Sequence, residues 1–232
     1  MSKSMFALGA AAALGIGGAA SASFVGVFAE SYAVNVGGSD YAVIDISIQF
    51  DNPNDTVLNL FNTEIFNMNG TAFHHNDFNT LAALPGTWSV TQTANLPALG
   101  LVPTNDSFVL IGGPIGSTNT TALDPSFTPA TAAVPPVNAG WFNSSPPNLQ
   151  GRVDAGTLRT FVGRFVIAGI SSAETLSFAF NMGFNQGLGT GAQFAYNNGA
   201  GRGPAFEIAY VPAPGAAALL GLAGLAGRRR RR

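Results

Sequence analysis

The chain has 232 residues, a formal net charge of −2, no cysteine and only 9% charged residues. Without cysteine there is neither a disulfide nor a thiol nucleophile, so stability must come from an apolar core. The scarcity of Lys and Arg argues against nucleic-acid binding, because a phosphate backbone is bound mainly by clustered cations.

The N-terminal segment has the three parts of a secretory signal peptide. Lys3 supplies positive charge, residues 5–16 are apolar, and Ala20-Ser21-Ala22 has the small-x-small pattern of a cleavage site. We therefore expect residues 1–22 to be a signal peptide, with Ala20 and Ala22 marking cleavage after Ala22. The alternative, a hydrophobic helix of the folded domain, fits poorly with so much Ala and Gly.

The rest of the chain up to residue 210 is dominated by a period of two. Four large apolar residues alternate with the polar residues Asp45, Ser47 and Gln49. The apolar residues are Ile44, Ile46, Ile48 and Phe50. This alternation is typical of a half-buried strand. Further strands are predicted at residues 24–36, 56–66, 87–93, 107–111, 158–170, 175–182, 191–196 and 206–210.

Two of these predicted strands carry the clearest apolar faces. One face comprises Phe161, Gly163, Phe165 and Ile167, and the other comprises Leu176, Phe178, Phe180 and Met182. Since no helical period is visible, we predict that residues 23–210 form a single all-β domain. The expected architecture is an antiparallel β-sandwich of Ig-like or jelly-roll type.

Two short polar motifs were considered as metal sites. Asp51 and Asp55 flank Asn52-Pro53-Asn54 and superficially resemble a calcium loop, but Asn62 stands where the bidentate glutamate is needed. We expect a capped turn there, with a single Ca²⁺ on Asp51 and Asp55 as the weaker alternative. His74 and His75 are adjacent, so on an extended segment they point to opposite faces and are expected to be a solvated loop pair.

Residues 112–151 interrupt the strand pattern. This segment holds Pro135-Pro136 and Pro146-Pro147 and shows no periodic hydrophobicity, so a long Pro-rich loop is predicted. Within it, Trp141, Phe142 and Asn143 form a possible glycan contact, because exposed aromatic rings stack on sugar faces. The alternative, which the sequence favours, is that the aromatic pair plugs the end of the sandwich and holds the loop down.

The sequence motifs favour a noncatalytic protein without a cofactor. Gly187-x-Gly189-x-x-Ala192 matches a relaxed dinucleotide fingerprint, but no helix is expected after it. The chain lacks a Gly-x-Ser-x-Gly nucleophile elbow. Paired carboxylates of a glycosidase remain an open alternative among the 12 acidic residues.

The C-terminal segment, residues 211–232, combines three elements in a fixed order. It begins with Val211, Pro212, Ala213 and Pro214, continues with an Ala/Gly/Leu stretch at 215–227, and ends with Arg228, Arg229, Arg230, Arg231 and Arg232. A helix over 215–227 would be roughly 20 Å long against a hydrocarbon core of roughly 30 Å, so insertion would be marginal. The arginines are expected to stop transfer on the cytoplasmic side.

This order resembles the PEP-CTERM sorting signal of bacterial exported proteins. That signal usually has a glutamate at the position where this chain has Ala213. The resemblance implies recognition by exosortase, a membrane protease, with transient insertion into the inner membrane and cleavage near 212–214. A nucleic-acid arm or an ordinary amphipathic helix would each need polar residues that 215–227 does not have. Residues 140–151 also resemble stretches of other exported proteins with such tails, a weaker likeness.

Removal of both ends would leave a strongly acidic domain. The remaining segment has no lysine and 12 acidic residues, and its four arginines are Arg152, Arg159, Arg164 and Arg202. Its net charge is therefore 4 − 12 = −8. We therefore expect a noncatalytic protein of the cell surface or the exopolysaccharide matrix of a Gram-negative-type bacterium. The alternatives are a carbohydrate-binding module that contacts polysaccharide and, second, a secreted glycosidase; nucleic acid is not an expected partner.

Overall fold

The computed structural model describes residues 24–75, 87–90, 103–116, 118–169, 174–186, 192–195 and 202–210, and the described chain is mostly β-strand. One antiparallel sheet contains, in spatial order, β1 (Phe24–Val36), β2 (Ser39–Phe50), β7 (Arg159–Ala168) and β4 (Phe108–Val109). The other contains β10 (Phe206–Tyr210), β8 (Glu174–Asn185), β3 (Thr56–Asn67), β6 (Trp141–Asn143) and β5 (Thr121–Leu123), with β9 (Ala192–Ala195) also paired to β8. Two short 3₁₀ helices, η3 (Pro103–Asn105) and η4 (Pro146–Asn148), complete the described elements.

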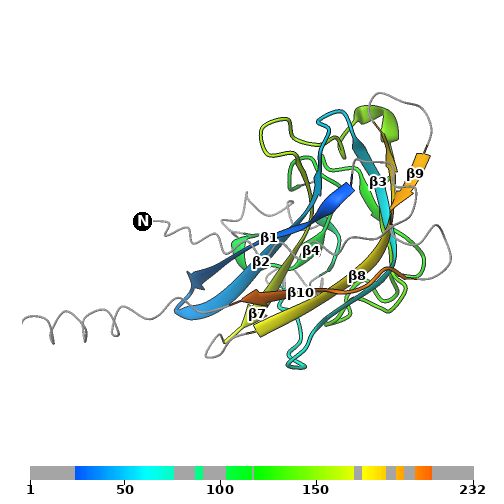
Figure 1. Ribbon diagram of the computed structural model, residues 1–232. Coiled ribbons are helices and arrows are strands. Elements are labelled where there is room, and N and C mark those ends of the chain that lie inside the picture. Colours follow the sequence, from blue (N-terminus) through cyan, green and yellow to red (C-terminus); the bar gives the residue numbers. More distant parts are fainter. Residues whose placement is uncertain are drawn as a thin grey trace, which may run out of the picture.

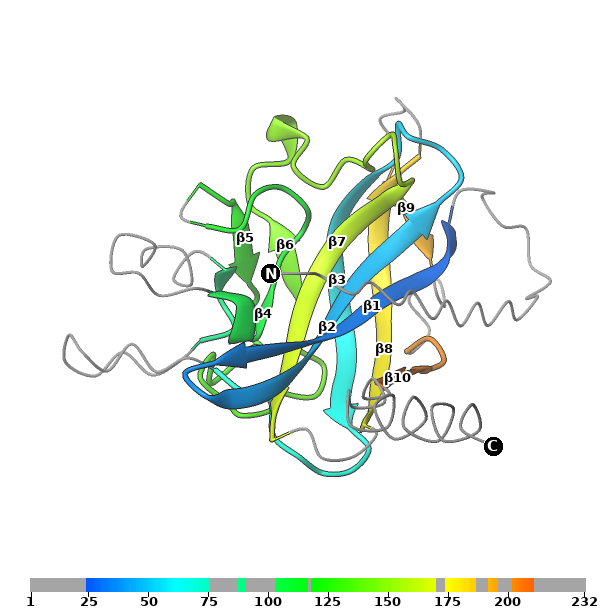
Figure 2. The ribbon, with the colours of Figure 1, turned by 90° about the vertical axis from the view of Figure 1, so that its left-hand side faces the viewer.

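The two sheets pack face to face as two layers. Figure 1 shows β1 and β2 running above β8 and β10, and Figure 2 looks onto the first sheet, with β1, β2 and β7 in front of β3 and β8 of the second. The layers meet through aromatic contacts such as Phe165 with Phe178, whose ring centroids are 5.9 Å apart, and Phe50 with Phe184 at 5.5 Å. The all-β prediction with two antiparallel sheets is therefore confirmed.

The predicted inward face of β2 is confirmed by burial. Its even-numbered apolar residues are at most 1% exposed and belong to the core, whereas Asp45, Ser47 and Gln49 are half-buried on the other face. The same holds for β8, where Leu176, Phe178, Phe180 and Met182 all lie in the core. Strict alternation along an extended chain decides which side chains enter the core.

The face predicted for β7 is wrong at one residue. Phe165 and Ile167 enter the core, but Phe161 packs on the opposite side against Phe108 in a small outer cluster. The cause is a bulge: Ile46 pairs with Gly163 while Ser47 pairs with Phe161, so Val162 is an extra residue in the ladder. One extra residue reverses the direction of every side chain beyond it.

The segment 112–151 differs most from its prediction. It contributes β5 and β6, which the sequence pattern missed, and these short strands extend the second sheet beyond β3. Each is three residues long, too short for a period of two to be recognised. The predicted strand at 87–93 is also reduced, within its described residues 87–90, to a bridge between Ser89 and Val109.

Neutral polar side chains hold the 112–151 segment in place. The Gln150 side-chain oxygen accepts hydrogen bonds from the Thr120 amide (2.7 Å) and hydroxyl, and its nitrogen donates to the Ile111 carbonyl (2.9 Å). Asn119 donates to the carbonyls of Gly112 and Pro114 at 2.9 and 2.8 Å. Such bonds satisfy backbone groups that a loop packed on the protein would otherwise leave unpaired.

No helix among the described residues is long and apolar enough to cross a membrane. The predicted signal segment, with Ala20 and Ala22, lies outside the described residues, and so does the whole of 211–232.

Candidate functional site

Trp141 is not available for sugar stacking. It is fully buried, and its indole Nε1 donates a 2.9 Å hydrogen bond to the Leu110 carbonyl. Asn143 is also buried and binds Thr120 and Asn148, so of the three predicted contact residues only Phe142 is exposed, at 37%. The burial contradicts the glycan platform and agrees with the alternative in which the Trp holds the segment down.

The Asp51–Asp55 turn is organised by an asparagine. The Asn52 side chain accepts a 2.9 Å bond from the Asn54 amide, and its carbonyl accepts one from the Asp55 amide. Asp55 is completely buried whereas Asp51 is exposed, so the two carboxylates lie in different environments. Among the described residues no group of three or more His, Asp or Glu side chains is placed to hold a metal ion.

The two histidines do point to different surroundings, as their adjacency predicts, but they are not a solvated pair. His74 lies against the ring of Tyr41, with centroids 4.7 Å apart. The His75 side chain is 8% exposed, packs edge-on to Trp88, and has Nδ1 3.6 Å from a carboxylate oxygen of Asp106. They therefore help to pack the 73–75 segment over the first sheet.

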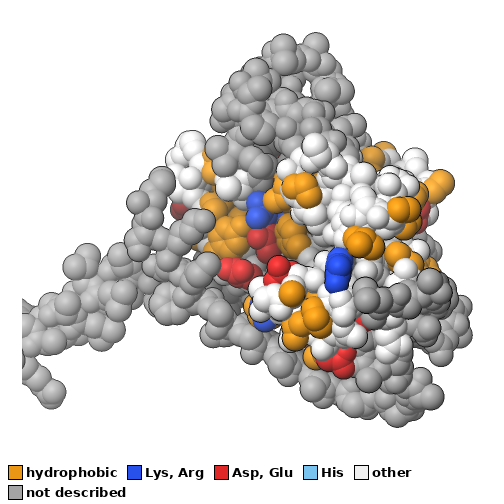
Figure 3. All heavy atoms as spheres, turned by 90° about the horizontal axis from the view of Figure 1, so that it is seen from above, with side chains coloured by type: hydrophobic (Ala, Val, Ile, Leu, Met, Phe, Trp, Pro, Cys, Tyr) orange, Lys and Arg blue, Asp and Glu red, His pale blue; other side chains and the backbone are white. Residues whose placement is uncertain are grey.

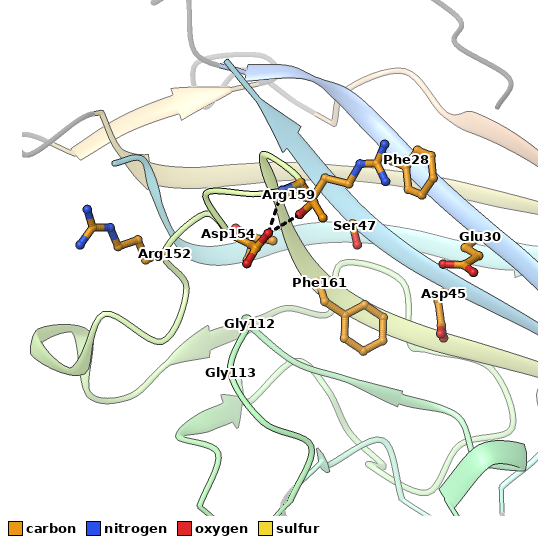
Figure 4. A pocket seen from close by; sticks show the side chains of 12 residues that line it. Phe28, Glu30, Asp45, Ser47, Gly112, Gly113, Arg152, Asp154, Arg159 and Phe161 are labelled. Atoms are coloured by element: carbon orange, nitrogen blue, oxygen red, sulfur yellow. Dashed lines mark hydrogen bonds between the residues drawn. The ribbon is translucent and has the colours of Figure 1, made fainter. Parts of the chain in front are cut away.

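A hollow of about 370 Å³ lies on the outer face of the first sheet, a region that the sequence did not single out. It is floored by β1, β2 and β7 and walled by residues 112–113 and 152–157 (Figure 4). We call it the β1–β2–β7 hollow. Its volume lies within the range of small-molecule sites.

Two cross-strand rows supply most of the floor of the hollow, with Arg164 beyond its edge. In one row, Glu30 on β1 pairs with Asp45 on β2, which pairs with Arg164 on β7. In the neighbouring row, Phe28 pairs with Ser47, which pairs with Phe161. Each row brings together residues far apart in the sequence, because side chains of directly opposed residues are neighbours on one face.

The Asp45 side chain is held by three hydrogen bonds. Arg164 donates to both of its oxygens, from Nε at 2.7 Å and from Nη2 at 2.8 Å, and the Tyr32 hydroxyl donates at 3.1 Å. Burial alone would lower the pKa of Arg164, but the hydrogen bonds and charge of Asp45 raise it. Burial and the charge of Asp45 also raise the pKa of Tyr32, so this phenol stays neutral.

Arg159 lies differently from the other arginines. Its guanidinium carbon is 3.2 Å from the centroid of the Phe28 ring, a cation–π arrangement visible in Figure 4. Its Nε is buried and has no hydrogen-bond partner in the described part of the chain. Asp154, which also lines the hollow, is instead occupied by its own turn: Thr157 donates to one of its oxygens from both backbone (2.8 Å) and side chain (2.9 Å). These bonds lower the pKa of Asp154.

No known protein family, no curated protein and no solved structure matches this chain. Figure 3 shows a described surface on which charged side chains are sparse and gather in a few places among hydrophobic ones. The hollow has both charged and hydrophobic groups. Its carboxylates accept hydrogen bonds, its guanidinium donates them, and two phenylalanine rings supply apolar surface. This mixture suits a hydroxylated ligand better than a purely apolar one.

Part of this site was visible in the sequence. Asp45 and Ser47 occupy the polar positions of the most regular predicted strand, so their outward direction follows from the period of two. The pairing of Arg164 with Asp45 and the position of Arg159 over Phe28 had no local signal, because they join β7 to strands more than 100 residues earlier.

Proposed function

We propose that this protein is a noncatalytic, exported surface or extracellular-matrix protein, delivered by its C-terminal tail. The observation that carries this proposal is the order of Val211-Pro212-Ala213-Pro214, the apolar stretch and the five terminal arginines, together with the N-terminal signal pattern. In the proposed route, the signal is cleaved after translocation. The tail then halts transfer, and an exosortase-type protease of the inner membrane cuts near 212–214.

We further propose that the two sheets form a sandwich of the Ig-like or jelly-roll class. The strand orders β1-β2-β7-β4 and β10-β8-β3-β6-β5 support this, since consecutive strands are shared between two packed antiparallel layers. Such a domain needs no disulfide when its core is continuous, and here one apolar cluster draws on both sheets.

The route is tested by the C-terminus of the mature protein. Mass spectrometry of protein recovered from the cell exterior should show a chain ending near 210–214, and an intact Arg232 there would contradict the proposal. Ala213→Glu places the family's usual residue in the motif and should be processed at least as completely. Replacement of all five terminal arginines by Gln should leave a signal-processed protein with an uncut tail.

A carbohydrate-binding module is the second candidate, and the β1–β2–β7 hollow is the observation that favours it. The module would use this hollow rather than Trp141, which is buried. A secreted glycosidase is the remaining alternative. Hydrolysis of matrix polysaccharide that is abolished by Glu30→Gln or Asp154→Asn would establish it and overturn the noncatalytic proposal.

A further inference from the structure

Arg159 is the arginine whose guanidinium has no hydrogen-bond acceptor among the described residues; its Nε is buried, so its two Nη groups are the donors that a ligand in the hollow could meet. The other three in the described chain are already engaged: Arg164 with Asp45, Arg202 with Glu64, and Arg152 with the Asn54 side chain and the Pro53 carbonyl. Arg159 has no carboxylate partner among the described residues, and its position is maintained by the Phe28 ring. The two Nη groups of a guanidinium positioned in this way can bind a carboxylate with two parallel hydrogen bonds.

The remaining polar lining accepts hydrogen bonds. Glu30 and Asp154 both border the hollow, and Asp154 uses one oxygen for its turn, which leaves the second oxygen without a donor among the described residues. Ser47 lies between the two phenylalanines on the floor. Carboxylates in these places repel additional anionic groups but accept well from hydroxyls. The matching ligand therefore carries, on each sugar-sized unit, one carboxylate among several hydroxyl groups.

We propose that the β1–β2–β7 hollow binds an acidic sugar unit, a uronic acid residue, with its carboxylate on Arg159 and its hydroxyls on Glu30 and Asp154. The rings of Phe28 and Phe161 supply the apolar surface beside it. This proposal rests on the proposed function only for the source of the ligand, an acidic polysaccharide outside the cell. The binding chemistry itself depends on the hollow alone.

An acidic peptide is the competing macromolecule. It also offers carboxylates, but it brings few hydroxyl donors for Glu30 and Asp154 and would place its other charges against them. The acidic balance of the domain, four arginines against 12 acidic residues between the predicted cleavage sites, disfavours a polyanion without compensating hydroxyls.

The test measures binding of oligogalacturonate to the purified full chain by isothermal titration calorimetry at low and moderate salt. Three matched probes separate the contributions: the methyl-esterified oligomer retains the hydroxyls but not the charge, neutral galacto-oligosaccharide lacks the carboxyl, and oligoglutamate has the charge without the hydroxyls. We expect the oligogalacturonate to bind most tightly, and the methyl ester and the neutral oligosaccharide to bind more weakly by about tenfold or more, with no detectable binding of oligoglutamate.

Variants then locate the site. Arg159→Gln should weaken binding about tenfold or more, and Arg159→Lys, which keeps the charge but not the fork, should weaken it less. Arg202→Gln is the matched control: it removes the same charge from a side chain that does not line the hollow and is paired with Glu64, and it should change affinity less than about threefold. Circular dichroism melting of each variant verifies folding.

Three results would overturn the proposal. Equal binding of the methyl ester would show that the carboxylate is not recognised, and equal binding of oligoglutamate would point to an acidic peptide instead. Equal losses in Arg159→Gln and Arg202→Gln would show general electrostatic attraction rather than a site. None of these results bears on export or tail cleavage, which the C-terminal mass spectrum tests separately.

Discussion

The indole nitrogen of Trp141 donates a 2.9 Å hydrogen bond to the carbonyl oxygen of Leu110, and both residues are completely buried. This bond joins β6 of the second sheet to the chain that follows β4 of the first sheet. Phe127 also packs against Trp141, with ring centroids 6.5 Å apart. Trp141 is therefore a structural residue that connects the two layers through the Pro-rich segment.

Trp141→Phe should lower the free energy of unfolding by about 2–4 kcal/mol. The change leaves the Leu110 carbonyl without its donor in a buried site and removes core volume. The free energy of unfolding is measured by urea denaturation, which is monitored through the fluorescence of the remaining Trp88 and through circular dichroism. Phe142→Ala, the exposed neighbour on the same strand, is the control and should cost less than about 1 kcal/mol. Comparable losses from both would contradict the structural role of Trp141.

Gln150→Ala should destabilise the protein by about 2 kcal/mol or more. The amide of Gln150 bridges Thr120 and Ile111, so its removal leaves several partly buried backbone groups unsatisfied. Hydrogen exchange should show increased amide exchange confined to residues near 111–121. Thr118→Ala, an exposed change in the same segment, should leave both measurements unaltered; if it matches Gln150→Ala, the segment is not held by these bonds.

Gly112→Ala should lower the stability of the protein more than Gly37→Ala does. Gly112 has a φ of 58°, and a Cβ added there would lie 2.3 Å from the Gln150 carbonyl oxygen. Gly37 has a similar φ of 62° but open space around it, so Gly37→Ala isolates the backbone term, about 1–2 kcal/mol. Thermal melting of both variants gives the comparison, and a Gly112→Ala protein no less stable than Gly37→Ala would rule out the close approach.

Alkaline pH should destabilise the protein in part through Tyr32. Its pKa is raised in the folded state, by burial and by Asp45, so the fold favours the neutral phenol. This stabilising contribution is complete below the ordinary tyrosine value of 10.0. It is lost as pH rises above that value, because the unfolded chain then ionises first. Burial raises the pKa of Tyr210 in the same direction.

Tyr32→Phe should therefore make stability less dependent on pH above about 10 while lowering it slightly at pH 7, where the hydrogen bond to Asp45 is missing. Chemical denaturation between about pH 7 and pH 11 measures both effects. Unchanged pH dependence in Tyr32→Phe would mean that other groups, Tyr210 among them, account for the alkaline loss.

Local sequence pattern was sufficient for the long strands and their inward faces. In β2, Ile44, Ile46 and Ile48 enter the core as predicted, because alternation along an extended chain is a property of the chain itself. The same pattern failed at Phe161, where an extra residue in the ladder reverses the alternation. That bulge arises from the pairing of β7 with β2. No residue in the β7 sequence itself indicates where the bulge lies.

The sequence by itself determined the periodic strands, the absence of disulfides, the acidic balance of the central segment and the order of tail elements that predicts export. Only the tertiary structure decided that Trp141 is buried and that Arg159 lies over Phe28. Both facts depend on which distant strands become neighbours and in which register. Register is fixed by the sum of many weak contacts across the sheets, whereas a strand's own pattern reports only which of its faces is apolar.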